Sequence, residues 1–258
     1  LPCKVTLAAI GVRLLHVRPF LMGKALIIAE KPSVALDISK ALGGFKKVDD
    51  YYESEHHVLA SAVGHLLELT VPEEFEVKRG RWTFDALPHL PPRFGLAPIE
   101  KSENKLKTLI RLIKRKDVDQ LINACDAGRE GELIFRNIIN YTGAKQPIQR
   151  LWLQSMTPTA IREGFQRLRS DADLRPLADA SICRSEADWL VGINGTRAMT
   201  AFNNKTGGFN KTTVGRVQTP TLAIVAEREE KIRKFIQRDY WEVIGNFDAS
   251  AGSYPGRW

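Results

Sequence analysis

Residues 25–34 read Ala-Leu-Ile-Ile-Ala-Glu-Lys-Pro-Ser-Val. The unbroken apolar run Ala25–Ala29 is typical of a strand that is buried on both faces of a parallel sheet. The charged pair Glu30-Lys31 forms a turn, and apolar residues then recur at helical spacing over Val34–Leu42. Gly43-Gly44 ends that helix. This order of strand, turn and helix predicts the first half of a βαβ unit.

Two further apolar segments, Val58–Val63 and Val118–Cys125, are predicted strands of the same sheet. The second is followed at once by the acidic run Asp126–Glu132 and then by helix-forming residues over Leu133–Tyr141. Strands that alternate with helices in this way indicate an α/β domain with a Rossmann-like parallel sheet. We place this domain at residues 23–145.

The second half of the sequence has a different pattern. Thr157-Pro158 is a typical helix start, and a long helical pattern follows over residues 174–202. Thr219-Pro220 opens another helix. We therefore predict a mainly helical domain over residues 146–236. The apolar and polar residues that alternate after it predict the start of a β domain over residues 237–258.

The composition is that of a folded protein with basic character. Hydrophobic residues make up 43% of the 258 residues, which excludes disorder over the whole chain. The net charge of +8 fits a polyanionic partner, although a solvated basic surface explains it equally well. Cys3, Cys125 and Cys183 form no CxxC pair, which argues against a zinc ribbon or a disulfide framework and fits a reducing compartment. No apolar run approaches the roughly 20 residues that span a bilayer, so we expect no membrane partner.

The first 21 residues carry three basic residues and no acidic one. Such a composition is shared by organelle targeting leaders. Met22 leads directly into the first predicted strand, however, so we favour the interpretation that translation starts there. Residues 1–22 are then a non-native or leader extension, and targeting to an organelle is the minority interpretation.

Acidic residues follow two of the predicted strands. Glu30 comes directly after the first strand and Asp126 directly after the third, with Glu130 a little further on. Ligands of open parallel sheets gather at the carboxyl ends of the strands, so these acids are expected to converge. Clustered carboxylates repel one another unless a cation holds them, and Mg²⁺ combines one or two carboxylates with water and phosphate oxygens. The alternative is a solvated acidic helix N-terminus, which the helix dipole stabilises.

Several stretches of this sequence together resemble one known family. The stretches that carry the likeness are Ile28–Ala35, Val63–Leu66, Asp126–Glu132, Arg184–Gly192, Asn194–Ala198 and Val214–Leu222. The three in the first half resemble the Toprim domain of type IA DNA topoisomerases, with the nearest likeness to bacterial topoisomerase III. The three in the second half resemble the helical DNA-binding domain of the same enzymes.

The resemblance implies roles for the acidic site. Glu30 would lie beside the scissile phosphate and take part in proton transfer, and Lys31 would stabilise phosphate charge. Asp126 would bind Mg²⁺ with Glu30 as a further ligand, and Glu130 would complete or tune the site both as a metal ligand and as a catalytic residue. The family commonly has a second Asp where this chain has Gly128. We therefore expect one Mg²⁺ rather than two, and Glu132 is a speculative substitute for the missing acid.

The resemblance also implies residues that contact DNA. Arg184, Arg197 and Arg216 would contact backbone phosphates, and Gln218 would make a polar contact to single-stranded DNA, with His65 as a further candidate. Each Arg has the alternative of an ion pair within the protein. His65 has the alternative of a place in the core.

The family cleaves one DNA strand with a tyrosine, and the covalent link preserves the bond energy for religation. That tyrosine lies in a Tyr-Pro-Arg-Thr-Asp-like motif. Ser253-Tyr254-Pro255-Gly256-Arg257 departs from this motif because Gly256 displaces the arginine and no Thr-Asp pair follows. We therefore expect no nucleophile in this chain, which resembles the amino-terminal part of the enzyme and is expected to be inactive alone.

The function implied by the resemblance is ATP-independent, Mg²⁺-dependent cleavage of one DNA strand, strand passage and religation, which together change DNA topology. The substrate would be single-stranded or negatively supercoiled DNA. A RecQ-type helicase is the protein partner that the resemblance suggests, in the bacterial cytoplasm at the nucleoid. Two alternatives remain at this point: a standalone Toprim primase or nuclease, and a DNA-binding module whose acids are structural.

Overall fold

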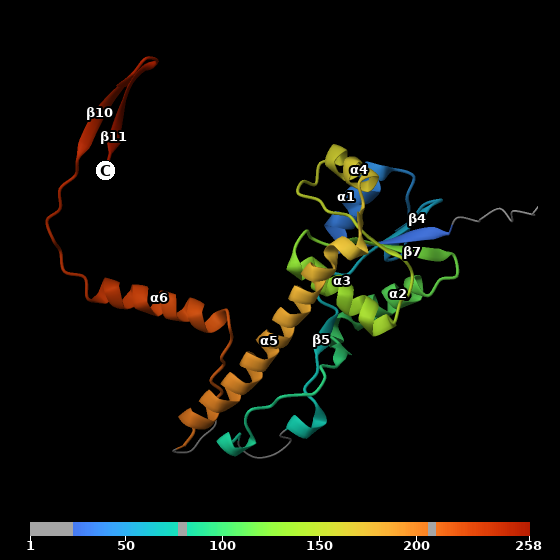
Figure 1. Cartoon of the computed structure of the whole chain (residues 1–258), viewed down its shortest axis with the longest axis horizontal. Coiled ribbons are helices and arrows are strands. Elements are labelled where there is room, and N and C mark those ends of the chain that lie inside the picture. The colour runs from blue at the N-terminus through green and yellow to red at the C-terminus, as the bar shows by residue number, and fades with distance from the viewer. Residues whose placement is uncertain (1–22, 77–81, 206–209) are drawn as a thin grey trace, which may run out of the picture. The chain divides into compact units, whose positions relative to one another are not determined.

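The computed structural model describes residues 23–76, 82–205 and 210–258. It divides into two compact units, which are treated separately below (Figure 1). The first combines the described residues up to 76 with residues 89–190, and the second combines residues 82–88 with residues 191–258. The expectations for residues 1–22 lie outside the described residues.

The first unit is built on a seven-stranded sheet in the order β2-β3-β4-β1-β7-β8-β9. Its strands are β1 (Lys24–Ala29), β2 (Lys46–Val48), β3 (Tyr51–Glu53), β4 (His57–Ser61), β7 (Val118–Ala124), β8 (Ile148–Arg150) and β9 (Arg169–Ser170). The central strand β1 pairs in parallel with both β4 and β7, and β7 pairs in parallel with β8. The outer strands β2, β3 and β9 are antiparallel. The predicted parallel α/β sheet is confirmed.

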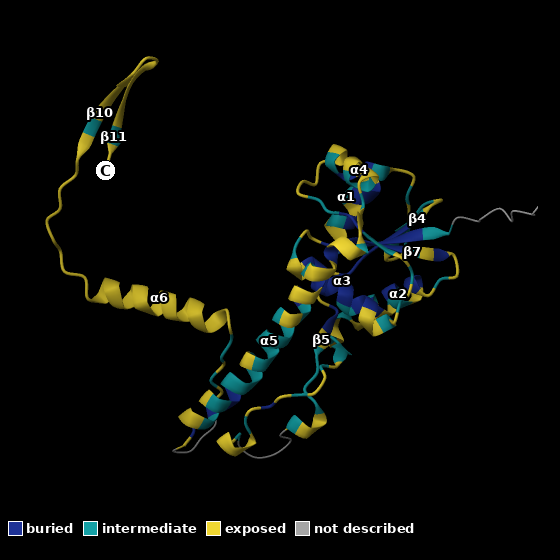
Figure 2. Cartoon of the chain, in the orientation of Figure 1, coloured by how far each residue is buried: buried dark blue, intermediate teal, exposed yellow. Residues whose placement is uncertain are grey.

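Helices cover both faces of this sheet. The helices of the unit are α1 (Pro32–Leu42), α2 (Glu103–Ile113), α3 (Arg129–Thr142), α4 (Pro158–Gln166) and the first part of α5 (Asp171–Asn203). Alternate residues of β1 enter different cores: Leu26 packs with residues of α2 and α3, and Ile27 packs with residues of α1 and α4. Both are fully buried. Figure 2 shows β1 and β7 as the dark blue centre of the unit.

The sheet extends further along the chain than the pattern predicts. Strands β8 and β9 join it after residue 145, and the first unit continues to residue 190, inside α5. Both strands are short and polar, so they lack the apolar run that made β1 and β7 visible. Strand β4 ends at Ser61 rather than Val63, because Val63 and Gly64 have φ angles of 62° and 80° and turn the chain out of the sheet.

The first unit also carries a small hairpin sheet of β5 (Leu67–Leu69) and β6 (Leu96–Pro98). Short 3-10 turns lie at Glu73–Phe75 and Glu100–Ser102 in this unit and at Phe84–Ala86 in the other. Among the helices that the structure describes, none is long and apolar enough to cross a membrane.

The second unit contains the end of α5, helix α6 (Gln218–Arg233) and the hairpin of β10 (Ile244–Ala249) and β11 (Gly252–Arg257). Two threonines of α5 hold the segment that precedes α6. The amide of Val214 donates to Thr196 Oγ1 at 3.0 Å, and the amide of Thr212 donates to Thr200 Oγ1 at 2.9 Å. Gly195 makes room for this segment, since a Cβ there would lie 2.8 Å from Val214 Cγ1. Two of the stretches quoted for the family resemblance therefore pack against each other.

Candidate metal and phosphate site

The chain forms a crevice where the strand order reverses. From β1 the chain crosses to β4 on one side, and β7 lies on the other side of β1. Ligands of open α/β sheets bind at such a switch point, outside the carboxyl ends of the strands. Glu30 follows β1 directly, and Asp126 lies two residues after the end of β7. The sheet topology therefore brings together two acids that are far apart in the sequence, as the spacing predicted.

Lys31 bridges these two carboxylates. Its Nζ lies 2.7 Å from Asp126 Oδ2 and 3.0 Å from Glu30 Oε1. The backbone amide of Asp126 donates to the other oxygen of Glu30 at 3.3 Å. The hydrogen bonds to Asp126 and Glu30 raise the pKa of Lys31 well above its usual range, so its ammonium stays charged. The site therefore holds a fixed cation between two anions, and half of the Lys31 side chain is open to solvent.

Glu130 and His65 lie near each other. Glu130 is in the first turn of α3, and its Oε2 lies 3.4 Å from His65 Nε2. Both side chains are largely exposed, so His65 is not a core residue. The turn that carries His65 is held to the β1 edge, because the amide of Gly64 donates to the carbonyl oxygen of Glu30 at 3.1 Å.

The donor set fits a hydrated Mg²⁺ better than a metal cage. Among the residues that the structure describes, no three His, Cys, Asp or Glu side chains form a group that could enclose a metal ion. Glu30 and Asp126 nevertheless both reach one ammonium, which shows that a small cation can contact both carboxylates. Oxygen ligands of this number suit Mg²⁺, which keeps much of its water. At Gly128 an added Cβ would meet no described atom within 4 Å, so the backbone leaves room for a side chain at this position but glycine supplies no second carboxylate.

Glu132 does not replace the missing acid. Its side chain is completely buried. One oxygen accepts hydrogen bonds from Arg150 Nε at 2.6 Å and Asn123 Nδ2 at 3.0 Å, and the other accepts one from Arg136 Nε at 3.3 Å. The speculative metal role of Glu132 is therefore not supported. The i,i+4 spacing of Glu132 and Arg136 was a visible signal for this ion pair, but nothing in the sequence pointed to Arg150.

A hollow of about 550 Å³ adjoins Asp126. It is lined by Cys125, Val34 and the segment 151–156, which includes Trp152. Burial raises the pKa of the Cys125 thiol far above its usual range, so this thiol stays protonated and unreactive. Cys125 is therefore not a candidate nucleophile at this edge of the sheet.

The candidate DNA-contacting arginines have different surroundings. In the first unit, Arg184 Nε lies 3.8 Å from Asp188 Oδ2 on the same helix, which corresponds to the expected alternative of an ion pair. In the second unit, Arg197 is buried beneath the ring of Trp82, with 5.6 Å between the guanidinium carbon and the ring centroid. Burial lowers the pKa of Arg197. A structural role explains both contacts.

Arg216 and Gln218 lie at the start of α6 with exposed side chains.

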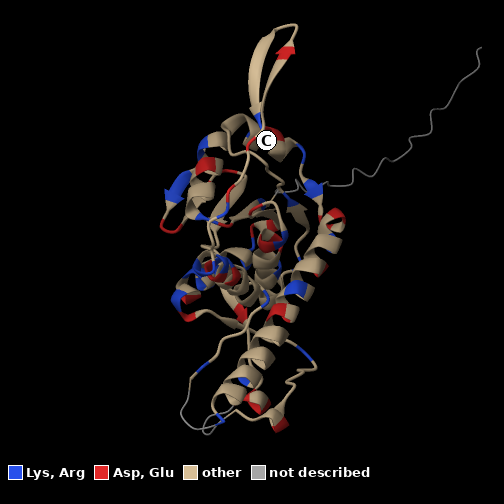
Figure 3. Ribbon diagram, turned by 90° about the vertical axis from the view of Figure 1, so that its left-hand side faces the viewer, with Lys and Arg blue, Asp and Glu red and all other residues tan. Residues whose placement is uncertain are grey.

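Tyr254 lies on β11, where its ring stacks on that of Phe247 at 5.5 Å between centroids. Strand β10 begins at Ile244, and the carbonyl of Val243 just before it accepts a hydrogen bond from the amide of Trp258 at 3.0 Å. Figure 3 shows basic and acidic residues interspersed along the ribbons of the helices, so the case for DNA depends on individual residues.

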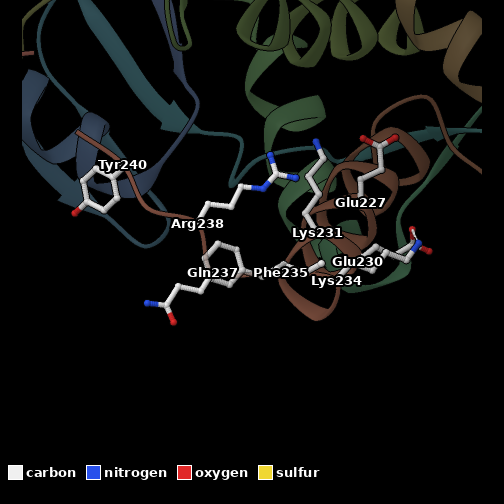
Figure 4. A pocket seen from close by; sticks show the side chains of 9 residues that line it. Glu227, Glu230, Lys231, Lys234, Phe235, Gln237, Arg238 and Tyr240 are labelled. Carbon is white, nitrogen blue, oxygen red and sulfur yellow. Dashed lines mark hydrogen bonds and ion pairs between the residues drawn. The ribbon is translucent and has the colours of Figure 1, made fainter. Parts of the chain in front are cut away.

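The second unit has a hollow of its own, of about 840 Å³, at the C-terminal end of α6. The side chains of Lys231, Arg238 and Glu227 extend to the same side of it, and Phe235 and Tyr240 also line it (Figure 4). The charged side chains that line this hollow are both acidic and basic, and they include no pair of converging carboxylates. We therefore retain the β1–β7 crevice as the candidate site.

Two family models match the chain. A family model described as the Toprim domain matches residues 25–156, and one described as DNA topoisomerase matches residues 173–255. The chain is 42% identical over 219 residues to DNA topoisomerase 3 of Shouchella clausii strain KSM-K16, covering 85% of this chain and 29% of that protein. It is 41% identical over 227 residues to DNA topoisomerase 3 of Bacillus subtilis strain 168, covering 88% of this chain and 30% of that protein.

A solved structure of full-length topoisomerase I from Thermotoga maritima has a similar fold. The TM-score is 0.54 at 24% sequence identity, over 86% of this chain and 33% of that one. The chain thus spans about 30% of the length of the curated relatives named above.

Proposed function

Since the chain belongs to the Toprim family and its residues 173–255 match the DNA topoisomerase family, we propose that it supplies the acidic site and DNA-binding helices of a topoisomerase III-like, type IA enzyme. In this proposal the enzyme cuts one DNA strand, passes another strand through the gap and religates it, without ATP. Single-stranded or negatively supercoiled DNA is the substrate. A RecQ-type helicase partner and a location at the nucleoid belong to the same proposal.

The observation that carries the proposal is the Lys31 bridge between Glu30 and Asp126. A phosphate that enters this crevice meets a permanent ammonium, which neutralises charge on its oxygens. Glu30 is mostly buried and lies against that ammonium, so its carboxylate is held in place beside the proposed phosphate position, and we assign the proton transfer to it.

Asp126 and Glu30 are proposed to hold one Mg²⁺ directly. Glu130, which does not form a three-carboxylate group with them among the described residues, is proposed to reach the ion only through water. When bound, the ion would polarise the phosphate and stabilise its charge. Arg216 is the proposed contact to backbone phosphates and Gln218 a proposed polar contact to single-stranded DNA, supported by their exposure. The same role for Arg184 and Arg197 has less support, because Arg197 is buried and only 34% of the Arg184 side chain is exposed. His65 remains a proposed DNA contact beside Glu130.

We assign no nucleophile among the five tyrosines, and therefore propose that the chain alone does not relax DNA. Incubation with negatively supercoiled plasmid and Mg²⁺ tests this point. Relaxation by the purified chain would contradict it. Metal-dependent nicking that leaves no protein-bound end, and that disappears in Glu30→Ala, would favour the alternative of a standalone Toprim nuclease.

The metal role is tested by titrating the chain with Mn²⁺ and following the ion by electron paramagnetic resonance. We expect Asp126→Asn to weaken binding about tenfold or more. The control is Asp117→Asn, because Asp117 is a similarly exposed carboxylate that pairs with Arg115 near the other end of β7. Equal Mn²⁺ binding by Asp126→Asn and wild type would favour a DNA-binding module with structural acids.

DNA binding is tested with a fluorescent single-stranded oligonucleotide at several salt concentrations. Contacts to phosphates release counterions, so affinity should fall as salt rises. Arg216→Gln should weaken binding and reduce the salt slope by about one. Binding that is insensitive to salt would contradict all of the proposed phosphate contacts.

A further inference from the structure

A guanidinium is buried in the first unit directly behind the segment that carries Asp126. Arg150 is the last residue of β8 and is 1% exposed. Charged side chains are seldom buried so fully unless they are paired and hydrogen-bonded. The roles proposed above for the site residues leave Arg150 without a function.

The guanidinium of Arg150 donates to main-chain carbonyl oxygens at the end of β7. Nη1 donates to the carbonyls of Asn123 at 3.1 Å and Cys125 at 2.7 Å, and Nη2 donates to the carbonyl of Asp126 at 2.7 Å. Nη1 also donates to the carbonyl of Leu151 at 2.7 Å. The β1–β7 pairing ends at Ala124. The carbonyls of Cys125 and Asp126 therefore lie beyond the sheet.

These contacts depend on the shape of a guanidinium. Its donors form a planar fork, whereas a lysine ammonium is a compact point charge. A lysine at position 150 would keep the charge but would lose several of the carbonyl contacts. The charge itself is balanced by Glu132, whose Oε1 accepts from Arg150 Nε at 2.6 Å. Burial lowers the pKa of Arg150, and the Glu132 carboxylate opposes this effect.

The backbone of Asp126 is held from a second direction. A Cβ added at Gly131 in the first turn of α3 would lie only 2.0 Å from the carbonyl oxygen of Asp126. The carbonyl of Asp126 therefore lies between the backbone of α3 and the guanidinium of Arg150. The side chain of Asp126 faces Lys31.

We propose that Arg150 is a positioning residue that fixes the main chain at residues 125–126, so that the Asp126 carboxylate faces Lys31 and Glu30. Arg150 acts through hydrogen bonds to the backbone and does not contact DNA or metal. The proposal rests on the proposed function only where it concerns metal binding by Asp126.

The test compares two buried arginines that share Glu132. Arg150→Lys removes contacts to the β7 end, whereas Arg136→Lys removes contacts to Glu132 and Asp171. We expect both variants to lose thermal stability. Only Arg150→Lys should speed amide hydrogen exchange over residues 125–131, about tenfold or more, and weaken Mn²⁺ binding by a similar factor.

Equal exchange over residues 125–131 in the two variants would overturn the proposal. If wild type does not bind Mn²⁺, the proposed metal site fails, while the exchange comparison still decides the role of Arg150. A Lys variant that does not fold is replaced by a measurement on the wild-type chain. Nuclear magnetic resonance should then detect couplings across the hydrogen bonds from Arg150 Nη to the carbonyl carbons of Cys125 and Asp126, and their absence would overturn the proposal.

Discussion

Replacing Glu132 with glutamine tests whether this carboxylate serves the core or a metal. Glu132 is fully buried, and its oxygens accept hydrogen bonds from Arg150 and Arg136. Glutamine keeps the size of the side chain but removes the charge that balances two buried guanidinium groups. Removing one partner of a buried ion pair typically costs about 3–5 kcal/mol.

The structure favours the lower end of this range. Arg136 keeps a second partner in Asp171, at 2.5 Å, so Arg150 is the guanidinium left without a carboxylate. We therefore expect Glu132→Gln to lower the free energy of unfolding of the first unit by about 3 kcal/mol. Amide hydrogen exchange of β1 and β7 reports on this unit alone, and urea denaturation followed by circular dichroism gives a second measurement.

Glu130→Gln is the matched control on the same helix. Its side chain is 68% exposed, so the free energy of unfolding should change by no more than about 0.5 kcal/mol. If the two variants differ by less than about 1 kcal/mol, the assignment of Glu132 as a core counter-charge is refuted.

Two further predictions concern stability away from the site. The hydrogen-bonded Arg115 lowers the pKa of Glu53 from 4.5 to about 2, so Glu53→Gln should cost about 1–2 kcal/mol at pH 7 after solvent screening. Since the folded pKa is depressed, the difference between wild type and variant in urea denaturation should shrink as pH falls from 4.5 to 2, and a constant difference would contradict this. Gly195→Ala should lower the melting temperature, because the new Cβ would lie 2.8 Å from Val214 Cγ1, and overpacking typically costs 1–3 kcal/mol. Gly192→Ala is the control, because a Cβ there would lie 4.0 Å from its nearest neighbour, the carbonyl oxygen of Val214. It should raise the melting temperature, as alanine usually does in place of glycine inside a helix. An increase in the melting temperature of both variants would show that α5 and Val214 are not closely packed at Gly195.

The features that the sequence predicted well are those that depend on a long apolar run. The run Ala25–Ala29 marked the central strand because both of its faces are buried, and the acids after β1 and β7 converge because the strands are parallel. A polar strand of three residues has no such signal, so β8 and its buried Arg150 were missed.

Contacts between segments that are distant in the sequence could not be predicted either. Arg197 was predicted to contact DNA from its place in a motif, but Trp82, which covers it, lies far away in the sequence. The same limit applies to Val63, where a left-handed backbone conformation ends β4 although the residue type favours a strand. Neither feature can be inferred from the residue types next to it.

The second unit is assembled from two stretches that the whole of residues 89–190 separates in the sequence. The ring of Trp82 covers Arg197, and the centroid of the Phe84 ring lies 5.9 Å from Lys205 Nζ. Residues 82–88 therefore supply aromatic side chains that pack against the end of α5. A fragment cut at residue 191 would therefore expose a guanidinium that the intact chain buries. In DNA-binding measurements, a helical fragment without residues 82–88 would present a basic surface that the intact chain covers.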